Sequence, residues 1–323
     1  MTQISVDNGF YRAGNFTPDT ALGTDWVYDM IVIGGGTGGL VAAGFAGRLG
    51  LKVALIEKEH LGGDCTWFGC VPSKALLKVA KVAHTIRTAD RYGLEASVPR
   101  VEMARVRDHV QQIVAETYSH ETPAAFSMKY GVDVFTGQGR FTEPHTVSVN
   151  GRLLKGKRFI IATGARPTVP SVAGLADVPY DTYRTIFTRD ELPEHLLIIG
   201  AGPIGVEMAQ AHARLGAQVT LVDAALLPRG EPEVHEVMLR VFEREGIRYV
   251  QELAVSVAQE AGIIHLALQN GEVVTGDALL VAAGRVPNVD TLDLDKAGVT
   301  HSTKGIQVDK YLRTGVRHHL RRW

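Results

Sequence analysis

The feature that most constrains the fold is a glycine pattern that occurs twice, each time between an apolar strand and a helix of small residues. In the first copy an apolar run ends at Gly34, and Gly36 and Gly39 complete the spacing G-x-G-x-x-G. In such a turn the first glycine allows the tight bend, the second lets backbone approach a pyrophosphate, and the third lets helix and strand pack closely. A second apolar strand ends on Glu57, 23 residues after Gly34, where a carboxylate would bind ribose hydroxyls.

The same pattern returns in the second half of the chain. Gly200, Gly202 and Gly205 follow the apolar run LLII, and Asp223 again lies 23 residues after the first glycine. Two dinucleotide-binding turns predict two dinucleotides, which is the composition of a flavoprotein that takes a hydride from a nicotinamide coenzyme. Asp223 favours an unphosphorylated ribose because its charge would repel a 2′-phosphate, but Arg229 lies nearby, so NADH and NADPH both stay open.

Both halves continue in the same way after the fingerprint. Alternating, strand-like segments follow each one, and the return strands end at Ala162, Thr163 and Gly164 in the first half and at Gly284 in the second. The sequence therefore predicts an α/β fold of two Rossmann-like domains, with parallel sheets and antiparallel strand insertions. Glu207, early in the second helix, either borders a nicotinamide site or is an exposed acid near the helix N-terminus.

Composition agrees with a globular chain of two domains. The 323 residues are 45% hydrophobic and 21% charged, and the net charge is −1. This balance gives no basic surface for nucleic acid or for membranes, so we expect small-molecule partners. No apolar run reaches the length of a membrane span, and the polar opening lacks a signal pattern, so we expect a cytoplasmic protein. Amphipathic stretches at 73–93 and 101–121 predict two helices.

The chain has only two cysteines, both in GGDCTWFGCVPSK at residues 62–74. A disulfide between Cys65 and Cys70 would close a loop too short to stabilise the fold by much. The spacing and the lack of a partner pair do not match a zinc site, so we predict no metal site. Two interpretations remain, a redox pair or two buried thiols. Trp67 and Phe68 either shield these thiols or fill core.

A redox pair would require a bend in the chain between the cysteines. Residues five apart in an ideal helix have Cα atoms about 8.7 Å apart, whereas a disulfide spans at most roughly 6.8 Å. Gly69 allows such a bend, and Pro72 suits the first turn of the helix that follows. Cys70 would then lie at a helix N-terminus with Lys74 one turn further on, and both features favour thiolate over thiol.

Together these motifs resemble the class I pyridine nucleotide-disulfide oxidoreductases, the family of dihydrolipoamide dehydrogenase, glutathione reductase and mercuric reductase. The resemblance rests on the two fingerprints, the cysteine motif, IIATGARP and VAAGRVPN in that order, and it covers residues 28–314. The stretch DCTWFGCVPSK is most similar to mercuric-reductase-like members.

The resemblance implies cofactors, site residues and a function. FAD would be held by Gly34, Gly36, Gly39, Glu57, Lys74, Ala162, Thr163 and Gly164. NAD(P)H would be bound by Gly200, Gly202, Gly205, Glu207, Asp223 and Gly284. Cys70 would be the flavin-side thiol and Cys65 the interchange thiol of a redox disulfide. A hydride from NAD(P)H would reduce FAD, then this disulfide, and finally a small disulfide or Hg(II).

The implied domain plan has five segments. They are a flexible N-terminal extension at 1–27, an FAD-binding domain with the cysteine pair at 28–168, an NAD(P)-binding domain at 169–285, a return segment at 286–314 and an aberrant tail at 315–323.

The tail VDKYLRTGVRHHLRRW departs from the family pattern. Family members continue after VDKYLRT with a strand resembling IYAAGD and a domain that forms a homodimer and supplies a histidine base to the partner's disulfide. We therefore assign no catalytic histidine, and we expect a missing final strand, an exposed sheet edge and no dimerisation domain. Codons exist for His318–Trp323 that would encode H-I-Y-A-A-G after deletion of one base, so we interpret the tail as a frame slip in the genome or in sequencing.

Two other functions stay open at this point. The chain could be a non-catalytic truncated product or a nucleotide-binding pseudoenzyme. It could also be a flavin NAD(P)H oxidase in which the cysteine pair takes no part.

Overall fold

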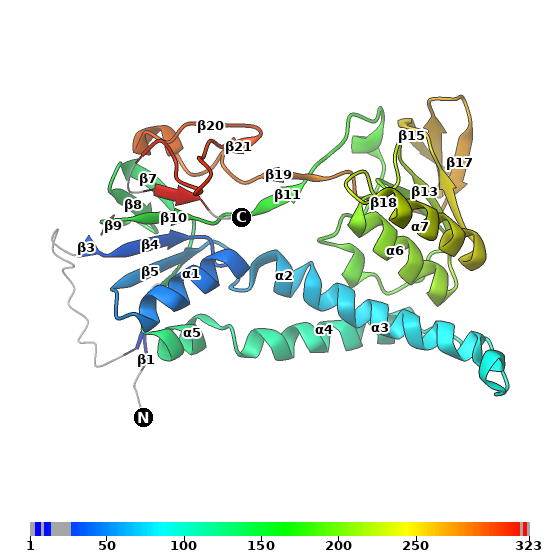
Figure 1. The fold of residues 1–323 in the computed structure, drawn as a ribbon, viewed down its shortest axis with the longest axis horizontal. Coiled ribbons are helices and arrows are strands. Elements are labelled where there is room, and N and C mark those ends of the chain that lie inside the picture. The colour runs from blue at the N-terminus through cyan, green and yellow to red at the C-terminus, as the bar shows by residue number, and fades with distance from the viewer. Residues whose placement is uncertain (1–3, 8–9, 14–26, 317–318, 322–323) are drawn as a thin grey trace. The chain divides into compact units, whose positions relative to one another are not determined.

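The computed structural model describes residues 4–7, 10–13, 27–316 and 319–321, and the chain divides into two compact units (Figure 1). The first unit comprises residues 1–67, 115–166 and 286–323, and the second comprises 68–114 and 167–285. The segment 68–114, which the sequence analysis placed with the first fingerprint, groups by its contacts with the second unit. The predicted boundaries of the cofactor-binding domains stay predictions.

The first unit contains a seven-stranded sheet in the order β1-β2-β6-β5-β4-β10-β22. Its strands are β1 (Ile4–Asp7), β2 (Phe10–Ala13), β4 (Met30–Ile33), β5 (Val53–Glu57), β6 (Asp133–Thr136), β10 (Phe159–Ile161) and β22 (His319–Arg321). From β6 to β22 all neighbours are parallel. The order β6-β5-β4-β10 is the order of a Rossmann unit, with the third, second and first strands followed by the return strand.

Small residues explain how the first helix packs on this sheet. Helix α1 (Thr37–Arg48) buries Gly39, Ala43, Gly44 and Ala46, so its backbone can lie close to strands whose side chains are buried on both faces. The other elements of this unit are α2 (Gly63–Trp67), α5 (Pro123–Tyr130), β3 (Val27–Tyr28), β7 (Arg140–Glu143), β8 (Thr146–Val149), β9 (Arg152–Gly156), β20 (His301–Ser302), β21 (Gly305–Ile306) and a 3₁₀ helix at Leu294–Ala297. Strands β7, β8 and β9 form the predicted antiparallel insertion.

The second unit repeats the plan with a four-stranded parallel sheet in the order β14-β13-β12-β18. Its strands and helices are β12 (His195–Ile199), β13 (Gln218–Val222), β14 (Ile247–Val250), β18 (Ala278–Val281), α3 (Cys70–Arg87), α6 (Pro203–Leu215) and α7 (Pro232–Glu245). Its antiparallel insertion is β15 (Ala254–Glu260), β16 (Ile263–Leu268) and β17 (Val273–Gly276). The 3₁₀ helices Ala89–Tyr92, Leu175–Asp177 and Ile186–Thr188 also belong to it.

Three elements, α4 (Met103–Ser119), β11 (Ala165–Pro167) and β19 (Arg285–Pro287), run across the boundaries between the compact units. Helix α4 is the second of the two predicted helices, and α3 is the first. Strands β11 and β19 pair in a two-stranded sheet.

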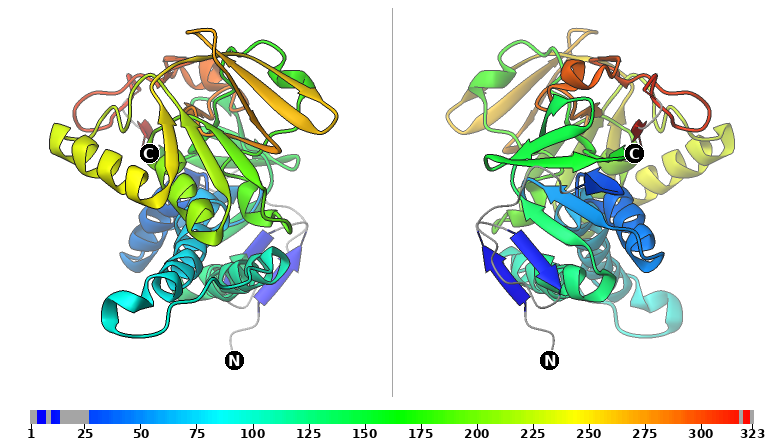
Figure 2. Two further views of the ribbon diagram at one scale, coloured as in Figure 1. Left: turned by 90° about the vertical axis from the view of Figure 1, so that its right-hand side faces the viewer. Right: turned by 90° about the vertical axis from the view of Figure 1, so that its left-hand side faces the viewer.

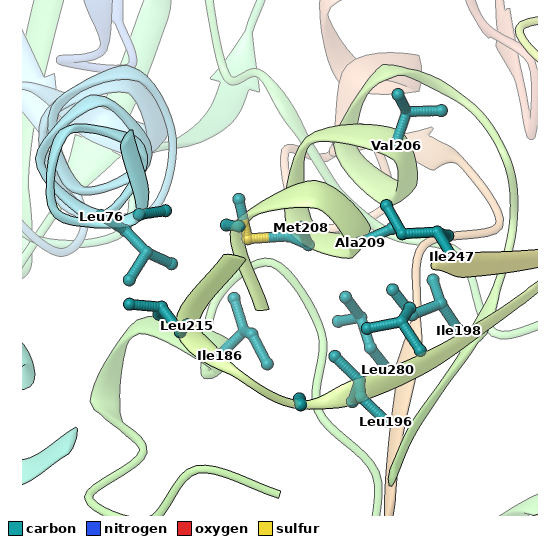
Figure 3. Packing of buried hydrophobic residues seen from close by; sticks show 14 of the residues in the cluster. Leu76, Ile186, Leu196, Ile198, Val206, Met208, Ala209, Leu215, Ile247 and Leu280 are labelled. Carbon is teal, nitrogen blue, oxygen red and sulfur yellow. The ribbon is translucent and has the colours of Figure 1, made fainter. Parts of the chain in front are cut away.

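The core of the second unit joins α3 to the sheet helix α6. Leu76 of α3, Ile186, Met208 of α6 and Leu280 of β18 are almost completely buried and belong to one cluster (Figure 3). The first turns of α3, which begin at Cys70, are therefore anchored by apolar packing within this unit.

Both ends of the large sheet differ from what the sequence analysis predicted. Within the extension expected to be flexible, residues 4–7 and 10–13 form the β1–β2 hairpin, which pairs with β6 and packs against α5 (Figure 2). The expectation of an exposed edge beside β10 is wrong for the described residues, because β22 pairs with β10 in parallel, with Phe159 opposite His319. The His319 ring is buried between those of Phe141 and Phe159, at 5.1 and 4.9 Å, so the tail has enough apolar packing to add a strand.

The predicted fold class is confirmed by two parallel sheets of Rossmann order, each with an antiparallel insertion. In the described part of the chain no helix is both long and apolar enough to cross a bilayer.

Candidate functional site

The first glycine fingerprint has the steric character that its spacing predicts. Gly34 has φ +104°, and a Cβ there would lie 2.3 Å from the carbonyl oxygen of Ala162 in the return strand. A Cβ on Gly39 would lie 1.8 Å from the carbonyl oxygen of Gly34. The turn therefore runs directly against β10, and only glycine fits at these two positions.

Glu57 closes this turn from the end of β5. Its Oε2 accepts a hydrogen bond from the Gly35 N–H at 2.6 Å, and its Oε1 accepts one from the Glu59 N–H at 2.7 Å. Burial raises the pKa of the Glu57 carboxyl, although these two hydrogen bonds oppose the rise. The carboxylate thus ties the fingerprint turn to the second strand, as the 23-residue spacing places it.

The glycines that open the cysteine motif cover the middle glycine of this fingerprint. Gly62 forms an isolated parallel bridge with Gly36, and its N–H donates to the Gly35 carbonyl at 2.9 Å. Gly63 has φ +56°, and a Cβ there would lie 2.6 Å from the Gly36 Cα. Sequence reasoning missed this role, and the signal was the Gly-Gly pair directly before the cysteine motif. A nucleotide phosphate at this turn would therefore lie beside the segment that leads to Cys65.

Helix α1 begins after this turn without a side-chain cap. The N-cap Gly36 makes no side-chain hydrogen bond, and the first turn contains no acidic residue. Its backbone N–H groups are therefore available to an anionic ligand, as in other dinucleotide turns.

The second fingerprint has the same backbone conformation and the same close contacts at its first and third glycines. Gly200 has φ +110° and a Cβ there would lie 2.5 Å from the Ala282 carbonyl oxygen, while one on Gly205 would lie 1.9 Å from that of Gly200. Gly202 is the N-cap of α6, which also lacks a side-chain cap and an acid in its first turn. A Cβ on Gly202 would meet nothing within 4 Å, so this turn is open where the first is covered.

Asp223 takes the place of Glu57 in the second unit. Its Oδ2 accepts a hydrogen bond from the Ala201 N–H at 2.7 Å, and its side chain is half-buried. The Tyr249 hydroxyl of β14 donates to the Asp223 carbonyl at 3.1 Å. Burial, and next the charge of Asp223, raise the pKa of the Tyr249 hydroxyl, so this donor stays protonated. Glu207 on α6 and Arg229 beyond Asp223 are both exposed.

The return segments carry the remaining predicted cofactor contacts. In the first unit the Thr163 hydroxyl donates to the Asn288 carbonyl at 2.7 Å, and the Asn288 side-chain amide donates to the Thr163 carbonyl at 2.9 Å. The Asn288 N–H donates to the Gly164 carbonyl at 3.1 Å, and Ala162 is buried against the fingerprint. Gly284 lies in the second unit with φ +114° and is exposed.

The cysteine motif is bent where the sequence analysis expected a bend. Helix α2 ends at Trp67 and α3 begins at Cys70, so Phe68 and Gly69 form the link. The Cys65 side chain is half-buried and that of Cys70 is exposed. Pro72 lies in the first turn of α3, as predicted, and Lys74 is exposed one turn after Cys70.

Aromatic side chains hold the Cys65 end of the motif in the first unit. The Trp67 ring packs against His60 and Tyr118, with ring centroids 4.6 and 4.8 Å apart, and its Nε1 donates to the Leu61 carbonyl at 3.0 Å. The Thr66 hydroxyl donates to Glu121 at 2.7 Å. Neither the contact of Trp67 with Tyr118 nor the hydrogen bond of Thr66 to Glu121 has a simple sequence signal, because both partners lie far along the chain from the cysteine motif.

These elements define a class of protein, one with two dinucleotide turns of equal geometry and a single CxxxxC thiol pair at the start of a helix. Comparisons with known proteins agree with this class. Residues 28–318 match the model of the pyridine nucleotide-disulphide oxidoreductase family. The chain belongs to this family, whose members of this kind use FAD and NAD(P)H.

Relatives include two kinds of curated enzyme. A mercuric reductase of Lysinibacillus sphaericus is 34% identical over 91% of this chain and 56% of its own length. A dihydrolipoyl dehydrogenase of Thermus scotoductus is 33% identical over 89% of this chain and 64% of its own length. The HOCl-induced flavoprotein disulfide reductase RclA of Escherichia coli has a similar solved structure, with a TM-score of 0.79, 26% identity and coverage of 91% of this chain and 65% of that one. The chain thus spans about half to two thirds of these relatives.

Proposed function

We propose that this protein acts as an FAD-dependent oxidoreductase that passes two electrons from NAD(P)H through Cys65 and Cys70 to a disulfide or a metal ion. One observation carries the proposal. The chain contains two glycine turns, each tied by a carboxylate at 2.6 or 2.7 Å, and a single cysteine pair whose motif begins on the first of these turns. Two dinucleotide sites and one dithiol in the same chain fit a relay from a nicotinamide coenzyme to sulfur.

The residues of the first unit fit an FAD site. Gly34, Gly36 and Gly39 leave a turn without side chains, and the uncapped N-terminus of α1 offers N–H donors for the pyrophosphate. Glu57 would hold the ribose, and Ala162, Thr163, Gly164 and Lys74 would contact the rest of the cofactor. When bound, FAD supplies a ring that accepts a hydride and gives up two electrons.

The second unit fits NADH better than NADPH. Asp223 uses Oδ2 for the Ala201 N–H, and its Oδ1 has no hydrogen bond to the described residues, so Oδ1 can accept from the ribose diol. The same charge opposes a 2′-phosphate, and the next residues are Ala224 and Ala225 instead of a cation. Gly200, Gly202, Gly205, Glu207 and Gly284 would complete the coenzyme site. The open turn at Gly202 suits a ligand that enters and leaves.

The two thiols would carry the exchange with substrate. Reduced Cys65, as thiolate, attacks one sulfur of an external disulfide, forms a mixed disulfide and releases one thiolate, which takes a proton. Cys70 then attacks the Cys65 sulfur, closes the Cys65–Cys70 bond and releases the second thiol. Two electrons and two protons leave the protein in each cycle. For Hg(II) the same thiolates would be the ligands.

Partners and location follow the family pattern. We propose a small disulfide or Hg(II) as substrate and a cytoplasmic location, where a dithiol is kept reduced by coenzyme, whereas the homodimer whose partner subunit supplies the acid–base group belongs to longer members of the family.

The test is turnover with three acceptors. The FAD-reconstituted chain is given NADH with lipoamide, with Hg(II) or with oxygen alone, and compared with Cys65→Ser and Cys70→Ser. Oxidation of NADH that needs lipoamide or Hg(II) and both cysteines supports the proposal. Oxidation by oxygen that both serine variants retain would make the chain a flavin oxidase, and absence of flavin binding would make it non-catalytic.

A further inference from the structure

The link between α2 and α3 sets the position of Cys70. Only Phe68 and Gly69 separate Trp67, the last residue of α2, from Cys70, the first of α3. Gly69, the N-cap of α3, has φ −126° and ψ −110° and gives no side-chain cap. A glycine link has high conformational freedom, so a contact made by Phe68 would restrict the backbone that leads into Cys70.

Arg184 makes that contact in the second unit. Its guanidinium carbon lies 4.2 Å from the centroid of the Phe68 ring, well within the range of a cation–π interaction. Both side chains are half-buried, so the stacking is partly protected from water.

The turn that carries Arg184 is held by its own hydrogen bonds. The Thr182 N–H donates to the Thr185 hydroxyl at 3.0 Å, and the Arg184 N–H donates to the Thr182 hydroxyl at 3.2 Å. The Thr185 hydroxyl in turn donates to Asp181 at 2.8 Å. The backbone from which Arg184 extends is therefore fixed.

The same turn shares a core with α3. Ile186, two residues after Arg184, is fully buried and belongs to the cluster that contains Leu76 of α3 (Figure 3). The turn that carries Arg184 therefore contacts the Cys70 region in two ways. Ile186 shares an apolar core with Leu76 of α3, and Arg184 stacks on Phe68, which precedes Cys70 by two residues. This arrangement keeps a positive charge against the ring of Phe68, and the N–H groups at the N-terminus of α3 also favour a nearby anion.

We propose that Arg184 is a positioning residue for the Cys70 end of the redox motif, which holds Phe68 by stacking and so keeps the Cys70 sulfur in a reactive position. The inference rests on the proposed function for the importance of Cys70, but its test does not need turnover. Because the chain has only two cysteines, Cys65→Ser leaves Cys70 as the single thiol and allows its reactivity to be measured alone.

The experiment measures the alkylation rate of Cys70 by iodoacetamide at neutral pH in the Cys65→Ser chain. Arg184→Gln is expected to slow it about two- to fivefold, the factor that one cation–π contact gives. Phe68→Leu is expected to slow it as well, and Arg184→Lys, which keeps the charge, to restore at least half of the lost rate. The double variant Arg184→Gln, Phe68→Leu is expected to be no slower than Arg184→Gln, because both changes break one contact.

Arg285→Gln is the matched control. It removes an equal charge from a guanidinium stacked on the neighbouring Tyr183, at 5.1 Å, and should leave the rate unchanged. Equal rates in the parent, Arg184→Gln and Phe68→Leu, or an equal fall in Arg285→Gln, would overturn the proposal. Should Arg184→Gln not fold by circular dichroism, Arg184→Lys and Phe68→Leu decide: both should be slower than the parent, and Phe68→Leu the slower of the two, while equal rates in all three proteins would overturn the proposal. A measured Arg184 effect with no turnover in the unmodified chain would refute the proposed function alone.

Discussion

The two fingerprint turns have the same skeleton but different surroundings. In both, the first glycine has a positive φ, and a Cβ on the third would lie 1.8 or 1.9 Å from the carbonyl oxygen of the first. In both, a carboxylate accepts a hydrogen bond from a backbone N–H of the turn, at 2.6 or 2.7 Å. In the first unit, Gly62 and Gly63 cover the middle glycine and Glu57 uses both oxygens within the protein. In the second unit, the middle glycine is open and Asp223 keeps one oxygen for a ligand.

This difference matches two kinds of ligand. A resident cofactor gains from a site that the chain itself encloses, whereas a coenzyme that is consumed in each cycle needs an open turn. The covering segment of the first turn is also the start of the cysteine motif, so the enclosed site is the one connected to the thiols.

The largest expected effects test the shared skeleton. Gly39→Ala and Gly205→Ala should each destabilise their unit by about 3 kcal/mol, because the new methyl group meets backbone at 1.8 or 1.9 Å. Urea unfolding followed by circular dichroism measures the loss. Gly36→Ala is the control, with its nearest contact at 3.8 Å, and should cost about 1 kcal/mol at most. An equal, small cost at all three positions would contradict the steric account.

Substitution of the middle glycine by valine distinguishes the covered turn of the first unit from the open turn of the second. Gly36→Val should destabilise the first unit by about 2 kcal/mol, because its methyl groups would reach Gly63. Gly202→Val should leave unfolding nearly unchanged but weaken binding of ADP-ribose, measured by titration calorimetry, by about tenfold or more. The reverse pattern would show that the second turn is the enclosed one.

Coenzyme choice tests the free oxygen of Asp223. Asp223→Ser should weaken ADP-ribose binding by about tenfold, because a hydrogen bond to a charged group is lost. It should also reduce the ratio of the affinity for ADP-ribose to the affinity for 2′-phospho-ADP-ribose. Glu231→Gln, the same charge change on an exposed residue nearby, should leave both affinities unchanged. Tighter binding of the 2′-phosphorylated ligand by the unmodified chain would refute a preference for NADH.

The smallest effect concerns the pH dependence at Glu57. Its folded-state pKa is raised above the ordinary value of 4.5, mainly by burial, so the folded chain binds more protons than the unfolded chain at pH values between the unfolded-state and the folded-state pKa. The free energy of unfolding therefore falls as pH rises through this window. Glu57→Gln removes this contribution, so its free energy of unfolding should fall less than that of the unmodified chain as pH rises from 4.5 through the folded-state pKa of Glu57. Parallel curves for the two proteins would contradict the raised pKa.

The sequence predicted what depends on local spacing. The positions of Gly34, Gly39 and Glu57 follow from sterics and from strand length, so their contacts could be anticipated, and so could the bend before Cys70. The roles assigned to these residues in cofactor and substrate binding stay predictions.

Contacts between distant segments could not be anticipated. The packing of Trp67 against Tyr118 and of Arg184 against Phe68 depends on tertiary arrangement, and no periodicity in the sequence encodes either. The expectation that the tail leaves the sheet edge at β10 exposed was wrong for a related reason. The residues of the tail differ from the expected strand, yet His319 fills an aromatic pocket and the backbone pairs with β10.

The most direct test of the central claim is a count of thiols after reduction by coenzyme. The chain is oxidised, freed of excess oxidant, reconstituted with FAD and given one equivalent of NADH without oxygen, and its thiols are then titrated with a chromogenic disulfide. The account predicts close to two new thiols per chain with FAD and none without it. Consumption of NADH with no new thiols would contradict the claim that the cysteine pair receives the electrons.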